Sequence, residues 1–243
     1  MATTVIAPRH PCTCNHTHHH HHNNTQDATP RRSPQKQFIV PPLSFQLVAT
    51  GVYRSGYPLE INFPMLERLC LKTIIYLGDQ DYLPENLAWC SSHNIKLYHY
   101  RQPAVREPFV SNDPTYISEA LTILLDRRNH PVLVHSNKGK HRAGVLVGCM
   151  RRVLQGWSLA ATHAEYGRYA GEKGEADLEF IELFNPELTY EEEWAPRWLR
   201  EGPEKATELS LRRCKRSIKS FIKLFHPELE YEEESGEEVK GKA

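Results

Sequence analysis

Residues 131–144 read Pro-Val-Leu-Val-His-Ser-Asn-Lys-Gly-Lys-His-Arg-Ala-Gly, and this stretch decides the fold. Its first four residues form an apolar, β-branched run that is typical of a buried strand. A short basic turn follows, and apolar residues with helical spacing begin after Arg142. Where a strand leads through a tight turn into a helix N-terminus, successive backbone N–H groups point at one spot and can bind an anion. The stretch therefore predicts a phosphate-binding loop.

The side chains of the turn fit the same chemistry. Gly139 allows a positive φ angle and a close approach of the backbone to a ligand. The positive charges of the turn attract an anion, and an arginine guanidinium can bind two phosphate oxygens at once. The helix macrodipole adds to this attraction. The candidate phosphate-binding residues are Asn137, Lys138, Gly139, Lys140, His141 and Arg142.

The chain between residues 38 and 190 alternates strand and helix patterns. This alternation predicts an α/β fold, with a central, mostly parallel sheet flanked by helices. Ligands of such sheets bind at the carboxyl ends of the strands, where residues 135–142 fall. The predicted strands are 71–77, 95–100 and 132–135, and the predicted helices are 61–69, 83–93, 116–126, 142–154, 158–169 and 176–184.

The composition limits the class of protein. The 243 residues allow one domain with tails, and 40% hydrophobic and 25% charged residues are typical of a soluble globular protein. The formal net charge of zero gives no general attraction to nucleic acid. The six cysteines are scattered, which favours a reducing compartment, and no apolar run reaches the ~18 residues of a membrane span. We therefore expect a cytosolic or nuclear protein that needs no cofactor or metal and binds neither membrane nor nucleic acid.

Two tails flank the predicted domain. Residues 1–37 are rich in His, Thr, Pro and Asn and are expected to be disordered, because they cannot bury enough apolar area. Their Cys12, Cys14 and histidine run could hold zinc, but the spacing matches no structural zinc module. Residues 191–243 form a charged extension, in which the stretch 221–235 repeats 180–194 at 11 of 15 positions. We expect a solvated helix there, with the binding of a protein partner as the alternative.

The spacing within the loop matches a known signature. His135, a nucleophile position at 136, five further residues and Arg142 match the His-Cys-(five residues)-Arg signature of cysteine-dependent phosphatases. The loop and flanking segments such as Tyr53–Pro58 resemble the plant and fungal atypical dual-specificity phosphatases. This family belongs to the protein-tyrosine-phosphatase superfamily and includes inositol pyrophosphate phosphatases. The resemblance covers residues 38–190 and implies the cysteine-phosphatase fold.

Two positions depart from the family signature. The resemblance implies a cysteine nucleophile at position 136, where this chain has Ser136, and a threonine at position 143, where it has Ala143. In the family the thiolate attacks phosphorus, the loop amides and the arginine stabilise the transition state, and the threonine helps the thiolate to leave. The resemblance also implies that His135 supports the loop and that His141 faces the substrate.

A serine hydroxyl in this loop is not an equivalent nucleophile. It needs an adjacent general base, because its proton is far harder to remove than that of a thiol. Alternation along the strand directs the His135 side chain away from that of Ser136, and a Ser136–His141 dyad is only a remote alternative. Loss of an essential nucleophile typically lowers the rate by a factor of about 10⁴ or more.

The general acid and the rim of the site differ from the family as well. Asp113 is the nearest candidate for the general acid and Glu107 is the other, but Asp113 before a proline is equally a helix cap. The resemblance implies a basic rim, for which Arg106 and Lys173 are the candidates. Gly174-Glu175 replaces the family's Ala-Arg, which should weaken the binding of inositol pyrophosphates more than that of phosphotyrosine.

Two functions follow from the sequence. The first is a phosphatase-family domain that binds an inositol pyrophosphate or a phosphoprotein, with hydrolysis lost or severely impaired because of Ser136. The second is an active dual-specificity or inositol pyrophosphate phosphatase in which Ser136 is an engineered or erroneous residue. A serine hydrolase of another kind is a remote third.

Overall fold

Six strands form a single sheet in the computed structural model, which describes residues 3–5, 39–105, 111–171 and 174–200. The strand order is β1-β5-β4-β6-β3-β2. The four inner strands are parallel, and the two edge strands run antiparallel to their neighbours. The predicted α/β fold with a mostly parallel sheet is therefore confirmed. The strands are β1 (Thr3–Val5), β2 (Gln46–Ala49), β3 (Val52–Ser55), β4 (Thr73–Leu77), β5 (Lys96–Tyr100) and β6 (Val132–His135).

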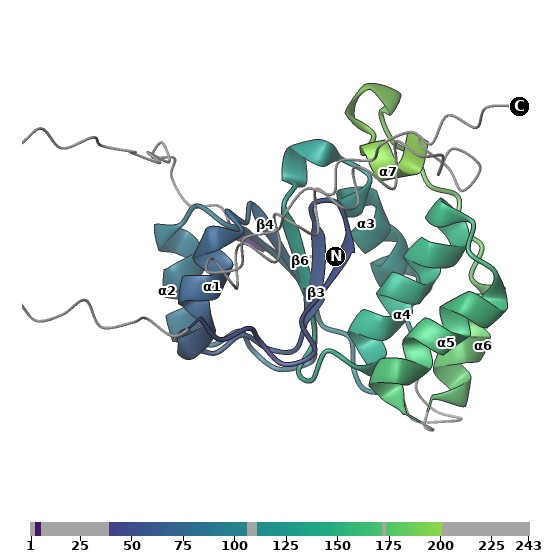
Figure 1. Ribbon diagram of the computed structural model, residues 1–243, viewed down its shortest axis with the longest axis horizontal. Helices are drawn as coiled ribbons and strands as arrows, with labels where there is room; N and C mark the ends of the chain where they lie inside the picture. Colours follow the sequence, from purple (N-terminus) through teal and green to yellow (C-terminus); the bar gives the residue numbers. More distant parts are fainter. Residues whose placement is uncertain (1–2, 6–38, 106–110, 172–173, 201–243) are drawn as a thin grey trace, which may run out of the picture. The chain divides into compact units, whose positions relative to one another are not determined.

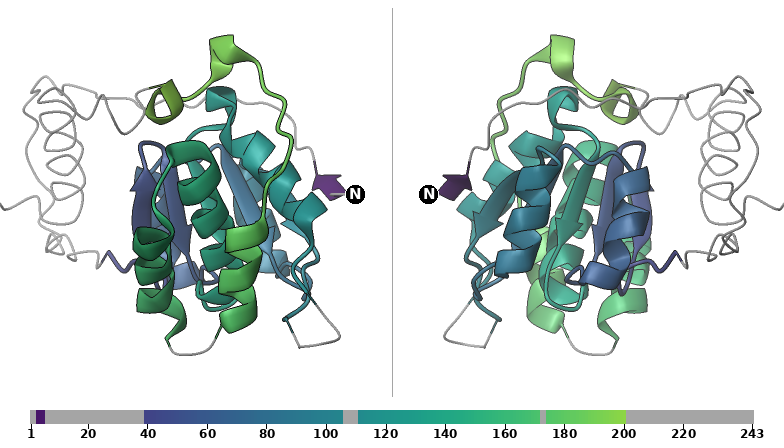
Figure 2. Two further views of the ribbon diagram at one scale, coloured as in Figure 1. Left: turned by 90° about the vertical axis from the view of Figure 1, so that its right-hand side faces the viewer. Right: turned by 90° about the vertical axis from the view of Figure 1, so that its left-hand side faces the viewer.

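Helices cover both faces of this sheet (Figure 1). Helices α1 and α2 lie on one face, and α3, α4, α5 and α6 lie on the other, as the two side views in Figure 2 also show. Each predicted helix is present with slightly shifted ends, and the predicted helix 142–154 is α4 followed by a π-helical turn, η3. The elements are η1 (Glu60–Asn62), α1 (Phe63–Arg68), α2 (Pro84–Ser92), α3 (Pro114–Leu124), η2 (Arg127–Asn129), α4 (His141–Cys149), η3 (Met150–Leu154), α5 (Leu159–Ala170), α6 (Glu175–Leu183), η4 (Glu192–Trp194) and α7 (Arg197–Arg200).

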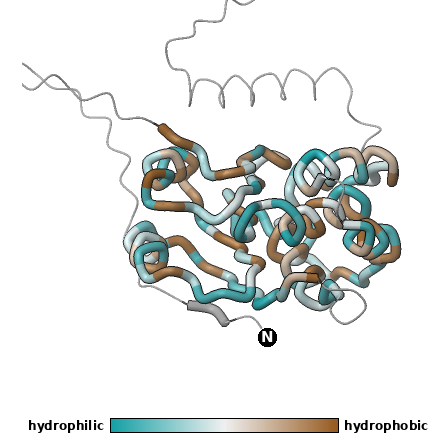
Figure 3. The backbone as a smooth tube through the Cα atoms, turned by 90° about the horizontal axis from the view of Figure 1, so that it is seen from below, coloured by the Kyte–Doolittle hydropathy of each residue, from teal (hydrophilic) through white to brown (hydrophobic). Residues whose placement is uncertain are grey.

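The two central strands, β4 and β6, are buried along their whole length. Their apolar runs do not alternate with polar residues because helices cover both faces of the sheet at this point. Helix α4 packs against them with Val145 and Leu146, which have no exposed surface. Figure 3 shows hydrophobic and hydrophilic residues interspersed along the flanking helices, as expected of helices with one buried side. No described helix is long and apolar enough to cross a membrane.

The first residues of the chain differ from the prediction. Thr3–Val5 form β1, which pairs antiparallel with β5 at the edge of the sheet. These residues belong to the tail 1–37 that we expected to be disordered, so the prediction is wrong for them. Thr and Val are β-branched and favour strands, and a sheet edge offers them backbone partners. Residues 6–38, with the Cys and His candidates for zinc, lie outside the described residues.

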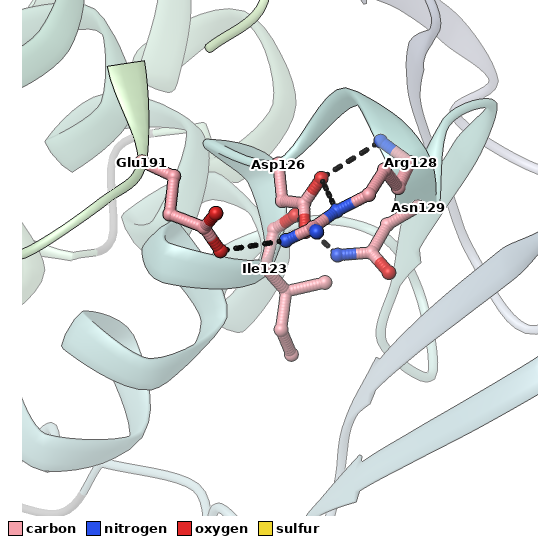
Figure 4. Close-up of polar contacts among 5 residues, drawn as sticks. All are labelled: Ile123, Asp126, Arg128, Asn129 and Glu191. Atoms are coloured by element: carbon pink, nitrogen blue, oxygen red, sulfur yellow. Dashed lines mark hydrogen bonds and ion pairs between the residues drawn. The ribbon is translucent and has the colours of Figure 1, made fainter. Parts of the chain in front are cut away.

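Two short helical turns follow residue 190, where we placed the end of the domain. Residues 191–200 carry η4 and α7, and Figure 4 shows how the chain is attached there. The guanidinium of Arg128, which follows α3, lies 3.0 Å from the Glu191 carboxylate and stacks over the ring of Trp194 at 4.8 Å. Residues 191–200 therefore contact the domain, and the boundary at 190 stays a prediction. The repeat at 221–235 lies outside the described residues.

Candidate phosphate-binding site

The predicted loop lies at the carboxyl ends of the parallel strands. It leaves β6 at Ser136 and enters α4 at His141, and the ends of β3 and β4 lie beside it because His135 is in register with both Ser55 and Tyr76. This is the edge of a parallel sheet at which ligands bind. The strand, turn and helix that the sequence predicted are therefore present in that order.

The carbonyl groups of the loop are held by residues that precede, form and follow β3. The backbone N–H of Tyr57 donates to the carbonyl of Asn137 at 3.1 Å, and the Ser44 hydroxyl donates to that of Lys138 at 3.1 Å. The Arg54 guanidinium donates to the carbonyl of Gly139 at 2.8 Å. Because these carbonyl oxygens are bound on the scaffold side, the amide groups of the loop are left for a ligand.

The start of α4 adds to this arrangement. Lys140 is the N-cap residue, and its side chain makes no capping hydrogen bond. The first N–H groups of a helix have no partner within the helix, and they carry the positive end of its dipole. Within the described part of the chain, no backbone carbonyl outside the helices accepts a hydrogen bond from the amides of residues 137–142. An anion is the partner that this geometry favours.

Gly139 is required for the shape of the turn. Its φ angle is +68°, in the left-handed region that side chains disfavour. A Cβ atom at this position would lie 2.5 Å from the backbone nitrogen of Gly56 and from the carbonyl carbon of Ser55. The loop therefore packs directly against the backbone that follows β3, which fixes its position.

Arg54 supports the loop from within the protein. The residue has no exposed surface, and its guanidinium stacks over the ring of Tyr169 in α5 at 3.8 Å. Burial lowers the pKa of Arg54 from its usual range, and interactions with Tyr169 and the Glu165 carboxylate oppose that shift. A buried cation beneath the loop adds positive potential at the place where an anion would bind.

Arg142 lies at the side of the loop, held by the ends of the neighbouring strands. Its Nη1 atom donates to the Asp79 carboxylate at 2.9 Å and to the carbonyl of Gln102 at 2.7 Å. Asp79 follows β4 and Gln102 follows β5, so both partners come from the sheet edge. One nitrogen makes both contacts, which leaves Nη2 and Nε for the bidentate binding of phosphate.

Ser136 lies at the base of the loop and is 3% exposed. Its backbone N–H donates to the carbonyl of Ser55 at 3.4 Å, and within the described part of the chain its hydroxyl makes no hydrogen bond. The ring of His135 is stacked on that of Tyr76, and its Nε2 atom lies 3.1 Å from the hydroxyl of Tyr82. Burial lowers the pKa of His135 to about 3, so the ring is neutral and supports the loop without acting as a base for Ser136.

The contacts of His141 bear on the remote alternative of a Ser136–His141 dyad. Its Nδ1 atom lies 2.9 Å from the hydroxyl of Tyr166 in α5 and 3.2 Å from the carboxylate of Asp177 in α6. The Ser136 hydroxyl therefore has no partner that could remove its proton in this arrangement. Among the described residues no hydrogen bond joins Ser136 to His141, and Nδ1 is engaged by two buried groups on other helices, so the structure gives the dyad no support.

These residues line one open pocket of about 860 Å³. Its positive side consists of the loop residues, and its opposite side includes Glu175 and Asp177 at the start of α6. Lys138 and Lys140 are exposed at the mouth. Among the described residues, no group of three or more His, Cys, Asp or Glu side chains could hold a metal ion. The pocket is lined by Ala104, Val105, Ser136, Asn137, Lys138, Lys140, His141, Arg142, Ala170, Gly174, Glu175, Ala176 and Asp177.

Comparison with known proteins agrees with this geometry. The model of the tyrosine phosphatase family matches residues 39–201. The chain belongs to the tyrosine phosphatase family. It is 43% identical over 150 residues to the inositol diphosphatase DSP4 of Arabidopsis thaliana, covering 61% of this chain and 75% of that protein. It is 46% identical over 155 residues to the tyrosine-protein phosphatase-like protein OCA2 of Saccharomyces cerevisiae, covering 61% and 77%.

Solved structures support the same assignment. The catalytic core of Siw14 from S. cerevisiae superimposes with a TM-score of 0.57 at 36% identity, over 74% of this chain and 95% of that one. The predicted resemblance to the atypical dual-specificity phosphatases and the cysteine-phosphatase fold are therefore confirmed. Within this tyrosine phosphatase domain, position 136 holds a serine.

The candidates for the general acid and the rim lie apart from the phosphate pocket or outside the described residues. Asp113 is the N-cap of α3, and its carboxylate accepts a hydrogen bond from the backbone N–H of Thr115 at 2.8 Å. This is the geometry of the helix cap, and Asp113 does not line the phosphate pocket. Glu107, Arg106 and Lys173 lie outside the described residues.

Four residues of the site had no role assigned from the sequence. Arg54 belongs to the segment that carries the family resemblance, but its contact with the loop spans 85 residues of sequence. Asp79 follows a buried strand at the binding edge, which is a usable signal for a site residue. Tyr166 and Asp177 lie on two different helices, and no spacing in the sequence connects them with His141.

Proposed function

We propose that this tyrosine phosphatase domain binds phosphorylated ligands at residues 135–142 and that its hydrolytic activity is lost or severely impaired. One observation carries the proposal. Ser136 occupies the nucleophile position beneath an otherwise intact phosphate loop, and its hydroxyl has no base among the described residues. Arg142 and the loop amides remain in position for an anion.

The chemistry follows from the nucleophile. A cysteine in this loop would ionise readily, because the helix N-terminus and the arginine stabilise a thiolate. A serine hydroxyl remains protonated under the same influence and cannot attack phosphorus without a base. His135 is buried and hydrogen-bonded to Tyr82, and His141 is turned toward Asp177. Binding and turnover are therefore separated in this chain.

Two classes of ligand fit the pocket. The relatives named inositol diphosphatases suggest an inositol pyrophosphate, and the family suggests a phosphotyrosine or phosphoprotein. Glu175 lines the pocket and is exposed, so its carboxylate repels a ligand that carries several phosphates. We therefore propose that Glu175 weakens the binding of inositol pyrophosphates more than that of phosphotyrosine. A cation at position 175 would have the opposite effect.

The second candidate function is that of an active phosphatase with cysteine at position 136. The observation that favours it is the completeness of the remaining site: the loop, Arg142 and the buried Arg54 are all in place. The two proposals differ in one atom of one side chain. A single substitution therefore distinguishes them.

The test is phosphate release from a panel of inositol pyrophosphates and phosphotyrosine peptides, with the unaltered protein compared with Ser136→Cys. We expect a silent natural protein and an active cysteine variant, with a ratio of about 10⁴ or more. Enzyme-like rates from the natural protein would contradict the proposal. If both proteins bind the ligand and neither releases phosphate, the general acid or the rim has been lost as well.

A further inference from the structure

The His141 ring is held by a buried polar cluster on the two helices that pack beside the loop. Its Nδ1 atom lies 2.9 Å from the Tyr166 hydroxyl and 3.2 Å from Oδ2 of Asp177. Tyr166 also donates its proton to Oδ2 of Asp177 in a short hydrogen bond. The other carboxylate oxygen accepts from the Asn112 amide at 2.8 Å. The Asp177 side chain is only 4% exposed, whereas that of His141 is 45% exposed and lines the pocket.

The hydrogen-bond inventory of this cluster fixes the proton of the ring. A carboxylate can only accept, so Asp177 requires donors from all its neighbours. Tyr166 has a single hydroxyl proton and gives it to Asp177, and toward His141 its oxygen can then only accept. Burial and the Asp177 carboxylate raise the pKa of Tyr166 well above its usual range, so this proton stays on the hydroxyl. Both partners of Nδ1 are therefore acceptors, and Nδ1 must carry the hydrogen.

We propose that Asp177 and Tyr166 are positioning residues that hold His141 with its proton on Nδ1, so that the lone pair of Nε2 faces the bound phosphate and accepts the hydrogen of a P–OH group. The inference deepens the proposed function and rests on it, because it names how one wall of the phosphate pocket is built. A histidine at the first position of α4 would otherwise rotate freely at the surface. The two anchors remove that freedom before the ligand arrives, so less entropy is lost on binding.

The cluster also explains how a carboxylate, that of Asp177, can lie beside an anion-binding site. Its carboxylate accepts hydrogen bonds from three donors, from Tyr166, Asn112 and His141, so its oxygen atoms are occupied within the protein. Glu175, two residues earlier, has an exposed carboxylate and receives no such cover from the described residues. The two acidic residues of one helix therefore act differently: Asp177 orients a ligand-binding side chain, and Glu175 repels anions.

The experiment measures the ring directly by long-range proton–nitrogen NMR of the histidine side chains. The chain has 14 histidines, and the signals of His141 are identified by their absence in His141→Gln. Spectra of the ligand-free protein, recorded where the ring carries a single proton, report the neutral tautomer. We expect the proton on Nδ1 in the unaltered protein and a shift toward Nε2 in Asp177→Asn, while Tyr166→Phe keeps it on Nδ1.

Affinity for inorganic phosphate, measured by calorimetry, is the second readout. We expect Asp177→Asn and His141→Gln each to weaken binding about tenfold, as expected for the loss of one hydrogen bond to a charged ligand. Glu179→Gln, an exposed carboxylate on the same helix outside the phosphate pocket, is the matched control and should leave the tautomer unchanged and the affinity equal or slightly higher. If Asp177→Asn does not fold, the tautomer of the unaltered protein and the affinity of His141→Gln still decide.

The outcomes distinguish failure of the positioning role from failure of the proposed function. A proton on Nε2 in the unaltered protein, or unchanged phosphate affinity in His141→Gln, would overturn the positioning role while leaving the proposed function intact. No measurable binding of phosphate or of any phosphorylated ligand by the unaltered protein would overturn the proposed function together with the Nε2 contact.

Discussion

Replacing Gly139 by alanine should abolish phosphate binding, because the added Cβ atom would push the loop out of position. An added Cβ atom would lie 2.5 Å from the backbone of Ser55 and Gly56, whereas ordinary contact begins at 3.4 Å. The loop must therefore move away from the backbone of these two residues by the difference between the two distances, 0.9 Å. A loop amide at about 2.9 Å from a phosphate oxygen would then lie at about 3.8 Å, beyond hydrogen-bonding distance. Each hydrogen bond lost to a charged ligand weakens binding by about 1.5–3 kcal/mol, or about 10- to 150-fold.

The stability of the domain should fall as well. The φ angle of +68° costs an alanine about 1–2 kcal/mol relative to glycine. Gly167→Ala is the matched control, because this glycine lies in α5 with nothing within 4 Å of its added Cβ. That substitution should raise the free energy of unfolding by up to ~1 kcal/mol and leave phosphate affinity unchanged. Calorimetry with inorganic phosphate and urea unfolding measure both effects. Equal phosphate affinity in Gly139→Ala and the unaltered protein would refute the reasoning.

Two further predictions concern the stability of the domain. Because the pKa of His135 is about 3 when folded and about 6.5 when unfolded, the unfolded state binds more protons between these values, and stability should fall as pH decreases, by up to ~1.4 kcal/mol per pH unit. Urea unfolding should show a shallower pH dependence for His135→Asn, and identical slopes would show that the ring is not buried and neutral. Trp194→Ala should lower the free energy of unfolding by ~1–2 kcal/mol, because it removes the stacking with Arg128 and half-buried apolar area, while phosphate affinity stays the same. Glu191→Gln breaks only an exposed ion pair, so its effect should stay below ~1 kcal/mol, and a larger loss than in Trp194→Ala would contradict this description.

The local patterns of the sequence predicted most of the fold. The apolar runs of β4 and β6 and the spacing of the helices reflect short-range physics, so these elements could be placed within a few residues. The phosphate loop was predicted because strand, turn and helix are adjacent in sequence. The hairpin of β2 and β3 was not predicted, because its strands are only four residues long and contain polar residues such as Gln46 and Arg54.

The supporting side chains of the site could not be predicted in the same way. Arg54, Asp79 and Asp177 reach the loop from 85, 63 and 36 residues away in the sequence, and a spacing pattern carries no information over such distances. The contact of Trp194 with the domain could not be predicted either, because it depends on the side chains of Arg127 and Arg128, which follow α3. Asp113 carried two readings in the sequence, and its hydrogen bond to Thr115 shows that it caps α3.

The most direct test of the central claim is one phosphorus NMR titration of the unaltered protein with a phosphotyrosine peptide and, separately, with a diphosphoinositol phosphate. We predict that the ligand signals shift or broaden on binding and that no inorganic phosphate signal grows over hours. Both results follow from an intact loop with Ser136 at its base. Growth of an inorganic phosphate signal at an enzymatic rate, or unperturbed ligand signals at millimolar protein, would contradict it.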